Sequence, residues 1–133
     1  ALGATKTTFA HNLLQGGATA VKIEGPYTNP TWLGNVAWKV AAAGDIPATG
    51  YIKADPLLTA DQHGIQRPQP GSPILGAALS SLPNVTVDLD GQERPSPPSI
   101  GADEVVKSAP KARWLTPADV GPQAGLTPPE PKS

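Results

Sequence analysis

Side chains able to carry out chemistry are scarce in the first part of the chain. His11 has no second histidine or carboxylate nearby at the spacing of a metal site. Glu24 is the only acidic residue before Asp45, so this part of the chain offers no pair of carboxylates for glycoside hydrolysis. The sequence contains no cysteine, which excludes disulfides, thiolate metal sites and cysteine nucleophiles. We therefore expect His11 to be exposed or packed, and not catalytic.

Four larger side chains could contact a bound sugar. Trp32 and Trp38 lie on either side of Asn35, and such indole rings either fill the protein interior or lie outside, where sugar rings can stack on them. We favour packing for the two tryptophans. Whether Tyr27, Trp32, Trp38 or Arg67 contacts a substrate stays open at this level.

The elements that would position these residues occur twice in the sequence. Residues 7–14 and 31–38 each carry a threonine, an aromatic residue, a small residue, an asparagine and then apolar residues, with Asn12 and Asn35 23 positions apart. A repeat of roughly 20 to 25 residues made of short strands has the length of one coil in a stacked β-solenoid. Between the copies, residues 20–24 alternate apolar and charged side chains, as a strand with one buried face does. The pattern predicts an all-β chain, a right-handed parallel β-helix, in which Asn12 and Asn35 form a hydrogen-bonded ladder.

The composition narrows the range of partners. Ten basic and 11 acidic residues give a net charge of -1, so nothing indicates binding to nucleic acid or to a membrane surface. No apolar run approaches the roughly 18 residues of a membrane-spanning helix. The 17 prolines, 14 glycines and only 5% of aromatic residues predict a thin core. There is no methionine, so we expect Ala1 to be a processed or cut end.

Patterns beyond the repeat predict further local structure. A helical turn is expected at residues 41–43, stopped by Gly44. A strand is expected at residues 85–89, ended by the turn Asp90-Gly91. Three prolines exclude residues 94–99 from a central strand, so this segment should cross the surface in an extended form.

The last part of the chain has few apolar residues. Trp114 and Leu115 are expected to anchor it. Thr116 is expected to cap a short helical turn that reaches Asp119.

Three phrases in the second half of the chain resemble the closing segment of a known superfamily. They are Gln69-Pro70-Gly71-Ser72-Pro73-Ile74, Asp88-Leu89-Asp90-Gly91-Gln92-Glu93-Arg94-Pro95 and Ile100-Gly101-Ala102-Asp103-Glu104. In that order and spacing they are similar to the closing segment of bacterial right-handed parallel β-helix proteins of the pectin-lyase-like superfamily. Ser99 stands where an aspartate is usual, and Leu75-Gly76 replaces the usual Asp-Ala. We expect both departures to weaken a surface or corner contact.

Three further phrases narrow the resemblance. Residues 8–14, 31–38 and 115–122 look like the late coils and C-terminal signature of polysaccharide lyase family 6, the chondroitinase B and alginate lyase group. The resemblance covers about residues 5 to 122. It implies that residues 1–122 form the C-terminal coils and irregular cap of a parallel β-helix. Residues 123–133 are then a flexible tail, since their prolines have nothing to bury.

The resemblance also implies β-elimination in an acidic polysaccharide. In such a lyase a calcium ion neutralises the uronate carboxylate, a lysine abstracts the proton from the adjacent carbon, and an arginine assists the leaving group. Calcium needs several oxygen ligands, and no cluster of carboxylates lies on the predicted strands. The calcium site, lysine and arginine of that family lie on earlier coils. We therefore assign no catalytic or metal-binding residue to this chain, expect it to bind no calcium, and expect Lys6, Lys22 and Lys39 to be solvated.

A chain that starts on a β-coil exposes an apolar cross-section and unpaired strand edges at its first end. We therefore expect residues 5–40 to dock onto preceding coils supplied by a separate chain, most simply the other part of the same cut polypeptide. The resemblance implies a secreted or periplasmic protein whose substrate is an acidic polysaccharide such as alginate.

Two other functions stay open. The superfamily phrases are shared with noncatalytic β-helix modules of bacterial surface or adhesion proteins. A glycoside hydrolase on the same fold would need paired Asp or Glu residues on its strands, and the late coils show none. The family 6 ending favours the lyase, because the anchored surface proteins usually continue into a membrane or sorting segment that this sequence does not contain.

Overall fold

The computed structural model describes residues 3–106, 111–116 and 119–121. The first four strands are β1 (Ala4–Thr5), β2 (Thr8–Ala10), β3 (Leu13–Gln15) and β4 (Thr19–Val21). The next four are β5 (Tyr27–Thr28), β6 (Thr31–Leu33), β7 (Asn35–Trp38) and β8 (Ala42–Gly44). The last three are β9 (Tyr51–Lys53), β10 (Leu58–Ala60) and β11 (Gln66–Pro68). Apart from these strands, two short 3-10 turns occur in this part of the chain, η1 (Ala48–Gly50) and one at Asp119, so the chain is all-β, as predicted.

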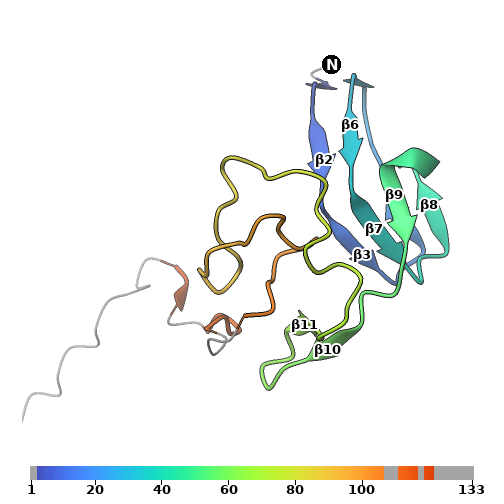
Figure 1. Cartoon of the computed structure of the whole chain (residues 1–133). Coiled ribbons are helices and arrows are strands. Elements are labelled where there is room, and N and C mark those ends of the chain that lie inside the picture. Colours follow the sequence, from blue (N-terminus) through green and yellow to red (C-terminus); the bar gives the residue numbers. More distant parts are fainter. Residues whose placement is uncertain (1–2, 107–110, 117–118, 122–133) are drawn as a thin grey trace, which may run out of the picture.

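The first eight strands pair in parallel with a constant offset (Figure 1). The strands β1, β2, β3 and β4 lie beside β5, β6, β7 and β8, with Ala4 opposite Tyr27, Thr8 opposite Thr31, Leu13 opposite Val36 and Thr19 opposite Ala42. Each pair joins residues 23 positions apart, which confirms the predicted repeat. The strand β9 adds a third member to the sheet β3-β7-β9.

Asn12 and Asn35 form the predicted ladder. The backbone N–H and the side-chain amide of Asn12 both donate to Asn35 Oδ1, at 3.0 and 2.9 Å. The Asn35 amide donates in turn to the carbonyls of Phe9 and Gly50, at 3.0 and 2.9 Å. Asn35 is only 1% exposed, so its polar groups join the two sets of paired strands inside the protein and are not free for a ligand.

Aromatic side chains stack between the same two coils. The rings of Phe9 and Trp32 lie 4.4 Å apart at 14°, on the paired strands β2 and β6. Gly50 comes so close to Trp32 that an added Cβ would lie 2.7 Å from the Cβ of Trp32. Trp32 therefore packs, as predicted.

The helical turn predicted at residues 41–43 is wrong, because this segment belongs to β8. The amide of Ala42 donates to the carbonyl of Ala18 at 2.9 Å, and Gly44 lies opposite Val21 in the parallel ladder. Gly44 has φ of 72° and approaches the Val21 carbonyl so closely that no Cβ would fit. Pairing with β4 thus outweighs the helix propensity of three alanines.

Residues 54–106, here called the closing segment, cover one face of the sheet β3-β7-β9. Figure 1 shows them as irregular loops beside β3, with the antiparallel hairpin of β10 and β11 at their start. Val36 from the sheet packs with Ile74, Ala78 and Ile100 from the closing segment, and Leu13 lies against this cluster. The thin core predicted from composition is therefore built between the sheet and loops.

The strand predicted at residues 85–89 is wrong. One isolated antiparallel bridge joins Val87 and Glu93, and Val85 and Val87 are each 47% exposed while Asp88 is buried. The segment does not alternate in burial, because Thr86 is exposed like the valines and Asp88 is buried where it accepts hydrogen bonds from the amides of Asp90 and Gln92, both at 2.9 Å. The predicted turn at Asp90-Gly91 is confirmed, with the Gly91 amide donating to the Asp88 carbonyl at 3.1 Å.

The segments after residue 93 agree only in part with the predictions made from the sequence. No strand forms at residues 94–99, as predicted, but Pro98 and Ser99 are buried beneath the surface. Trp114 and Leu115 are 67% and 72% exposed, so the predicted anchor is wrong. Thr116 and Asp119 are joined as the predicted short turn requires: the Asp119 amide donates to the Thr116 carbonyl at 2.9 Å, and the Thr116 amide and hydroxyl donate to Asp119 Oδ2 at 2.7 and 2.6 Å. The Thr116 hydroxyl thus donates to a carboxylate and caps no described backbone amide. The predicted end at Ala1 and tail at 123–133 lie outside the described residues.

A search of the described residues finds no helix with the length and apolar character needed to cross a membrane.

Candidate functional site

The three lysines considered for chemistry are all exposed, as predicted. Lys22 pairs with Glu24 at 2.6 Å, and both side chains are largely in solvent. Lys39 lies with its Nζ 5.8 Å from the centroid of the Trp38 ring. Among the described residues, none of the three is near the buried charges of the closing segment.

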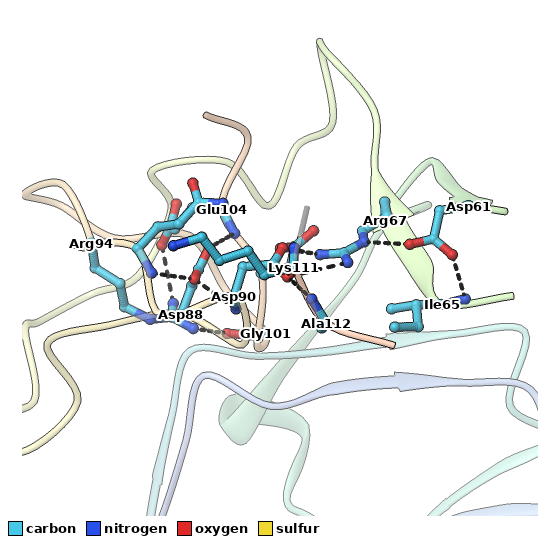
Figure 2. Close-up of polar contacts among 12 residues, drawn as sticks. Asp61, Ile65, Arg67, Asp88, Asp90, Arg94, Gly101, Glu104, Lys111 and Ala112 are labelled. Atoms are coloured by element: carbon cyan, nitrogen blue, oxygen red, sulfur yellow. Dashed lines mark hydrogen bonds and ion pairs between the residues drawn. The ribbon is translucent and has the colours of Figure 1, made fainter. Parts of the chain in front are cut away.

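Arg67, by contrast, is at the centre of a buried charge network (Figure 2). Its guanidinium donates to Asp61 at 3.1 Å, to Asp90 at 2.5 Å and to Asp103 at 2.8 Å. The residue is only 8% exposed. A second bond to Asp90, from Nη2 at 3.5 Å, brings the engaged N–H groups to four of the five in the guanidinium, so Arg67 acts as a structural cation.

Local structure places each carboxylate of this network. Arg67 lies on β11, and Asp61 closes the turn of the β10–β11 hairpin by accepting hydrogen bonds from the amides of His63 and Ile65, at 2.8 and 3.0 Å. Asp90 sits in the Asp88 turn and also accepts from the amides of Lys111 and Ala112. The network therefore binds three separate loops to one arginine.

Burial and hydrogen bonding act in opposite directions on these carboxyls. Burial alone raises the pKa of Asp61 and of Asp90, but backbone amides and the Arg67 guanidinium outweigh it and leave both pKa values lowered. The pKa of Asp103 is raised, because burial outweighs the attraction of Arg67. Burial lowers the pKa of Arg67, yet the carboxylates around it raise that pKa overall. Arg67 therefore stays charged, and Asp61 and Asp90 are its ionised partners.

Arg94 organises a second buried network beside the first. It donates to Glu104 at 3.0 Å and to the carbonyls of Ser99 and Gly101, at 3.2 and 2.8 Å. Glu104 in turn accepts from the Ser99 amide at 2.8 Å and from the Ser99 hydroxyl at 2.5 Å. Ser99 is 3% exposed, so the expectation that this residue weakens a surface or corner contact is wrong. Two of the phrases that carried the superfamily resemblance, residues 88–95 and 100–104, thus meet around buried charges.

Asp88, Asp90 and Asp103 form a cluster that the sequence analysis missed. They are buried, and one carboxylate oxygen from each lies within 4.8 Å of the others. The Asp-x-Asp spacing at 88 and 90 was a visible signal, but Asp103 joins them only through the fold. Arg67 already donates to two of the three, and Asp88 caps backbone amides, so calcium would have to displace a guanidinium. These residues do not fit a calcium site.

His11 connects the coils to the closing segment. Its backbone amide donates to Leu33 and its carbonyl accepts from Gly101, both at 2.9 Å. The ring Nε2 is buried without a hydrogen-bond partner among the described residues, beside a small cavity of about 140 Å³ that Arg94 also lines. Burial lowers the pKa of His11, and the positive charge of Arg94 lowers it further. The ring is packed and favours its neutral form.

Acidification should therefore destabilise the fold through His11. The pKa of His11 is lowered from 6.5 in the folded chain, so the unfolded chain binds more protons as the pH falls. The stability that neutral His11 contributes is present above pH 6.5 and is lost as the pH drops through the folded pKa. Each unit of lowering corresponds to about 1.4 kcal/mol.

Thermal unfolding midpoints between about pH 7.5 and pH 5 measure this effect. The native chain should lose more stability on acidification than His11→Asn, in which asparagine tolerates the backbone φ of 54° at this position. His63→Asn is the matched control and should follow the native chain. Equal pH slopes for the native chain and His11→Asn would show that protonation of His11 is not linked to folding.

Comparison of the chain with known protein families, with curated proteins and with solved structures finds no match.

Proposed function

We propose that residues 3–106 form the last coils and the closing segment of a right-handed parallel β-helix. The observation that carries this proposal is the constant parallel offset between two successive sets of four strands. An asparagine ladder and stacked aromatic rings inside the same two sets support it. The closing segment then covers the face of the sheet β3-β7-β9 that carries Leu13 and Val36.

The first set of strands is the surface for a partner. Among the described residues, β1, β2 and β4 each have a neighbour on one edge only, as do β5, β6 and β8, and β3 is paired only with β7. A cavity of about 310 Å³ opens among Phe9, Leu14, Val21 and Trp32, and no described donor reaches Asn12 Oδ1. The cavity and the ladder, and not the edges alone, therefore favour the first set. Unpaired edges, half-buried apolar side chains and an unfinished ladder all favour one further coil of the same kind. We assign that coil to preceding β-helix coils on a separate chain.

The whole protein is, in this proposal, a polysaccharide lyase that cleaves an acidic, uronate-containing polysaccharide such as alginate by β-elimination. Its support is the resemblance of the repeat and closing phrases to polysaccharide lyase family 6. The catalytic lysine and arginine and the calcium site belong to the preceding coils, and this chain contributes structure. The protein would act in a secreted or periplasmic setting, where such polymers occur.

Activity is tested on the chain in its native assembly, with alginate and chondroitin sulfate as substrates. β-Elimination creates a conjugated double bond, whose ultraviolet absorbance should rise with time and stop when calcium is chelated. Carboxyl-reduced alginate is the matched control and should not be cleaved. No absorbance change with either polymer would contradict the lyase function. Binding to the polymers without cleavage would instead support the noncatalytic surface module.

A further inference from the structure

One part of the sheet β3-β7-β9 is not covered by the closing segment. Leu13 and Val36 face the closing segment and pack against its core. Two residues further along the same strands, on the same face, Gln15 lies opposite Trp38. These two side chains border an open groove of about 430 Å³, whose other wall includes Leu58. The volume is in the range of sites for small ligands, roughly 300 to 1,000 Å³.

The groove combines an aromatic face with polar groups. Trp38 is partly buried and held by β7, so its ring is a fixed platform. Gln15 and Thr59 border the groove with exposed polar side chains. Gln69 uses its amide nitrogen on the Arg67 carbonyl, at 3.4 Å, which leaves its amide oxygen to accept. A flat apolar ring surrounded by donors and acceptors suits a sugar, which has an apolar face and hydroxyls at its rim.

Lys39 supplies the one cationic side chain among the described residues that line the groove, and Asp55 supplies the one carboxylate. Its Nζ lies 5.8 Å from the centroid of the Trp38 ring, and it makes no ion pair with any described residue. Asp55 on the opposite side holds the Leu57 amide at 3.0 Å, and its remaining oxygen can accept from a hydroxyl. The Lys39 ammonium lies over the Trp38 ring, so a sugar that stacks on this face displaces it, and the carboxylate of the sugar can then pair with the displaced ammonium.

We propose that this groove binds one uronate unit of an acidic polysaccharide, with Trp38 stacking on the sugar ring and Lys39 pairing with its carboxylate. The choice of a uronate rests on the proposed function, whereas the groove itself rests on the contacts above.

The test is affinity electrophoresis of the full chain, in its native assembly, through gels that contain alginate or neutral dextran. The native protein should be retarded by alginate and not by dextran. Trp38→Ala should weaken alginate binding about tenfold, the size of a lost aromatic contact. Lys39→Asn should weaken it about two- to fivefold, as expected for one solvent-exposed ion pair.

Two matched variants separate the groove from general effects. Lys6→Asn replaces another exposed lysine with the same φ of 52°, and Trp114→Ala removes an exposed tryptophan far along the sequence; both should bind as the native chain does. A native-like circular dichroism spectrum would show that Trp38→Ala is folded. If Trp38→Ala is not folded, the difference in alginate binding between Lys39→Asn and Lys6→Asn decides the test.

Equal retardation by alginate and dextran, or unchanged alginate binding by Lys39→Asn and by folded Trp38→Ala, would overturn the inference. Cleavage of alginate with unchanged binding by both variants would leave the lyase intact and the groove refuted. Binding that depends on Trp38 and Lys39, without any unsaturated product, would support the groove as a binding site and refute the lyase function.

Discussion

Replacing Arg67 by methionine is expected to lower the free energy of unfolding by about 3–5 kcal/mol, the usual cost of removing one partner from a buried ion pair. The guanidinium donates to Asp61, Asp90 and Asp103, and Asp90 and Asp103 are each less than a tenth exposed. Without Arg67, these carboxyls would either keep uncompensated charge or take up protons. The loops that hold them would then separate from the β10–β11 hairpin.

Urea unfolding at neutral pH, followed by circular dichroism, measures the loss. Arg113→Met is the matched control: Arg113 also pairs with a carboxylate, Asp119, but its side chain is 51% exposed, so the midpoint should stay close to the native one. Part of the stability lost in Arg67→Met should return on mild acidification, since protonation removes the unpaired charges. A variant as stable as the native chain would show that the network does not hold the closing segment.

Asn35→Asp should be nearly as damaging, although it changes one atom of the side chain. The amide nitrogen of Asn35 donates to the carbonyls of Phe9 and Gly50. In the variant, a carboxylate oxygen would take the place of this nitrogen and face the two carbonyl oxygens. Two buried acceptors would lose their donor, at about 1–3 kcal/mol each, and a buried charge would be added. We expect a loss of about 3 kcal/mol or more.

The same urea experiment measures this loss, and its pH dependence identifies the cause. Protonation of the new carboxyl restores one donor, so the variant should regain stability relative to the native chain as the pH falls toward about 4. Asn29→Asp, at an exposed loop position, is the control and should be neutral. A stable Asn35→Asp chain at neutral pH would mean that the ladder does not bind the two coils.

The coils could be predicted from sequence because their contacts repeat. Asn12 and Asn35 occupy the same place in two copies of one phrase, and the parallel register brings equivalent positions together. A contact between copies is visible in a sequence as a period. The pairing of Leu13 with Val36 follows from the same offset of 23 residues.

The closing segment could not be predicted in this way, because its contacts do not repeat. Asp88 alternates with valines as in a strand, but its carboxylate caps backbone amides and turns the valines outward. Trp114 was expected to anchor the chain from its size alone, and it lies 67% exposed. Where no ladder of backbone hydrogen bonds fixes the chain, the type of a side chain does not predict whether it points into the protein or into solvent.

The charge network shows the same limit. Arg67 pairs with Asp90 and Asp103, which lie 23 and 36 residues further along an irregular part of the chain, and no local sequence pattern connects the three. The superfamily phrases contain Asp90, Arg94 and Glu104, but they do not show that these residues are buried and paired. Their residue types are explained by the buried ion pairs and hydrogen bonds that they make.

The most direct test of the account is the native mass of the purified chain, measured beside its intact mass under denaturing conditions. The account predicts a denaturing species of 13.6 kDa that copurifies with a larger second chain, and a native mass equal to their complex. The preceding coils, the calcium site and the catalytic lysine and arginine should then be found on the second chain. A folded monomer of 13.6 kDa that unfolds cooperatively, or an assembly made only of copies of this chain, would contradict it.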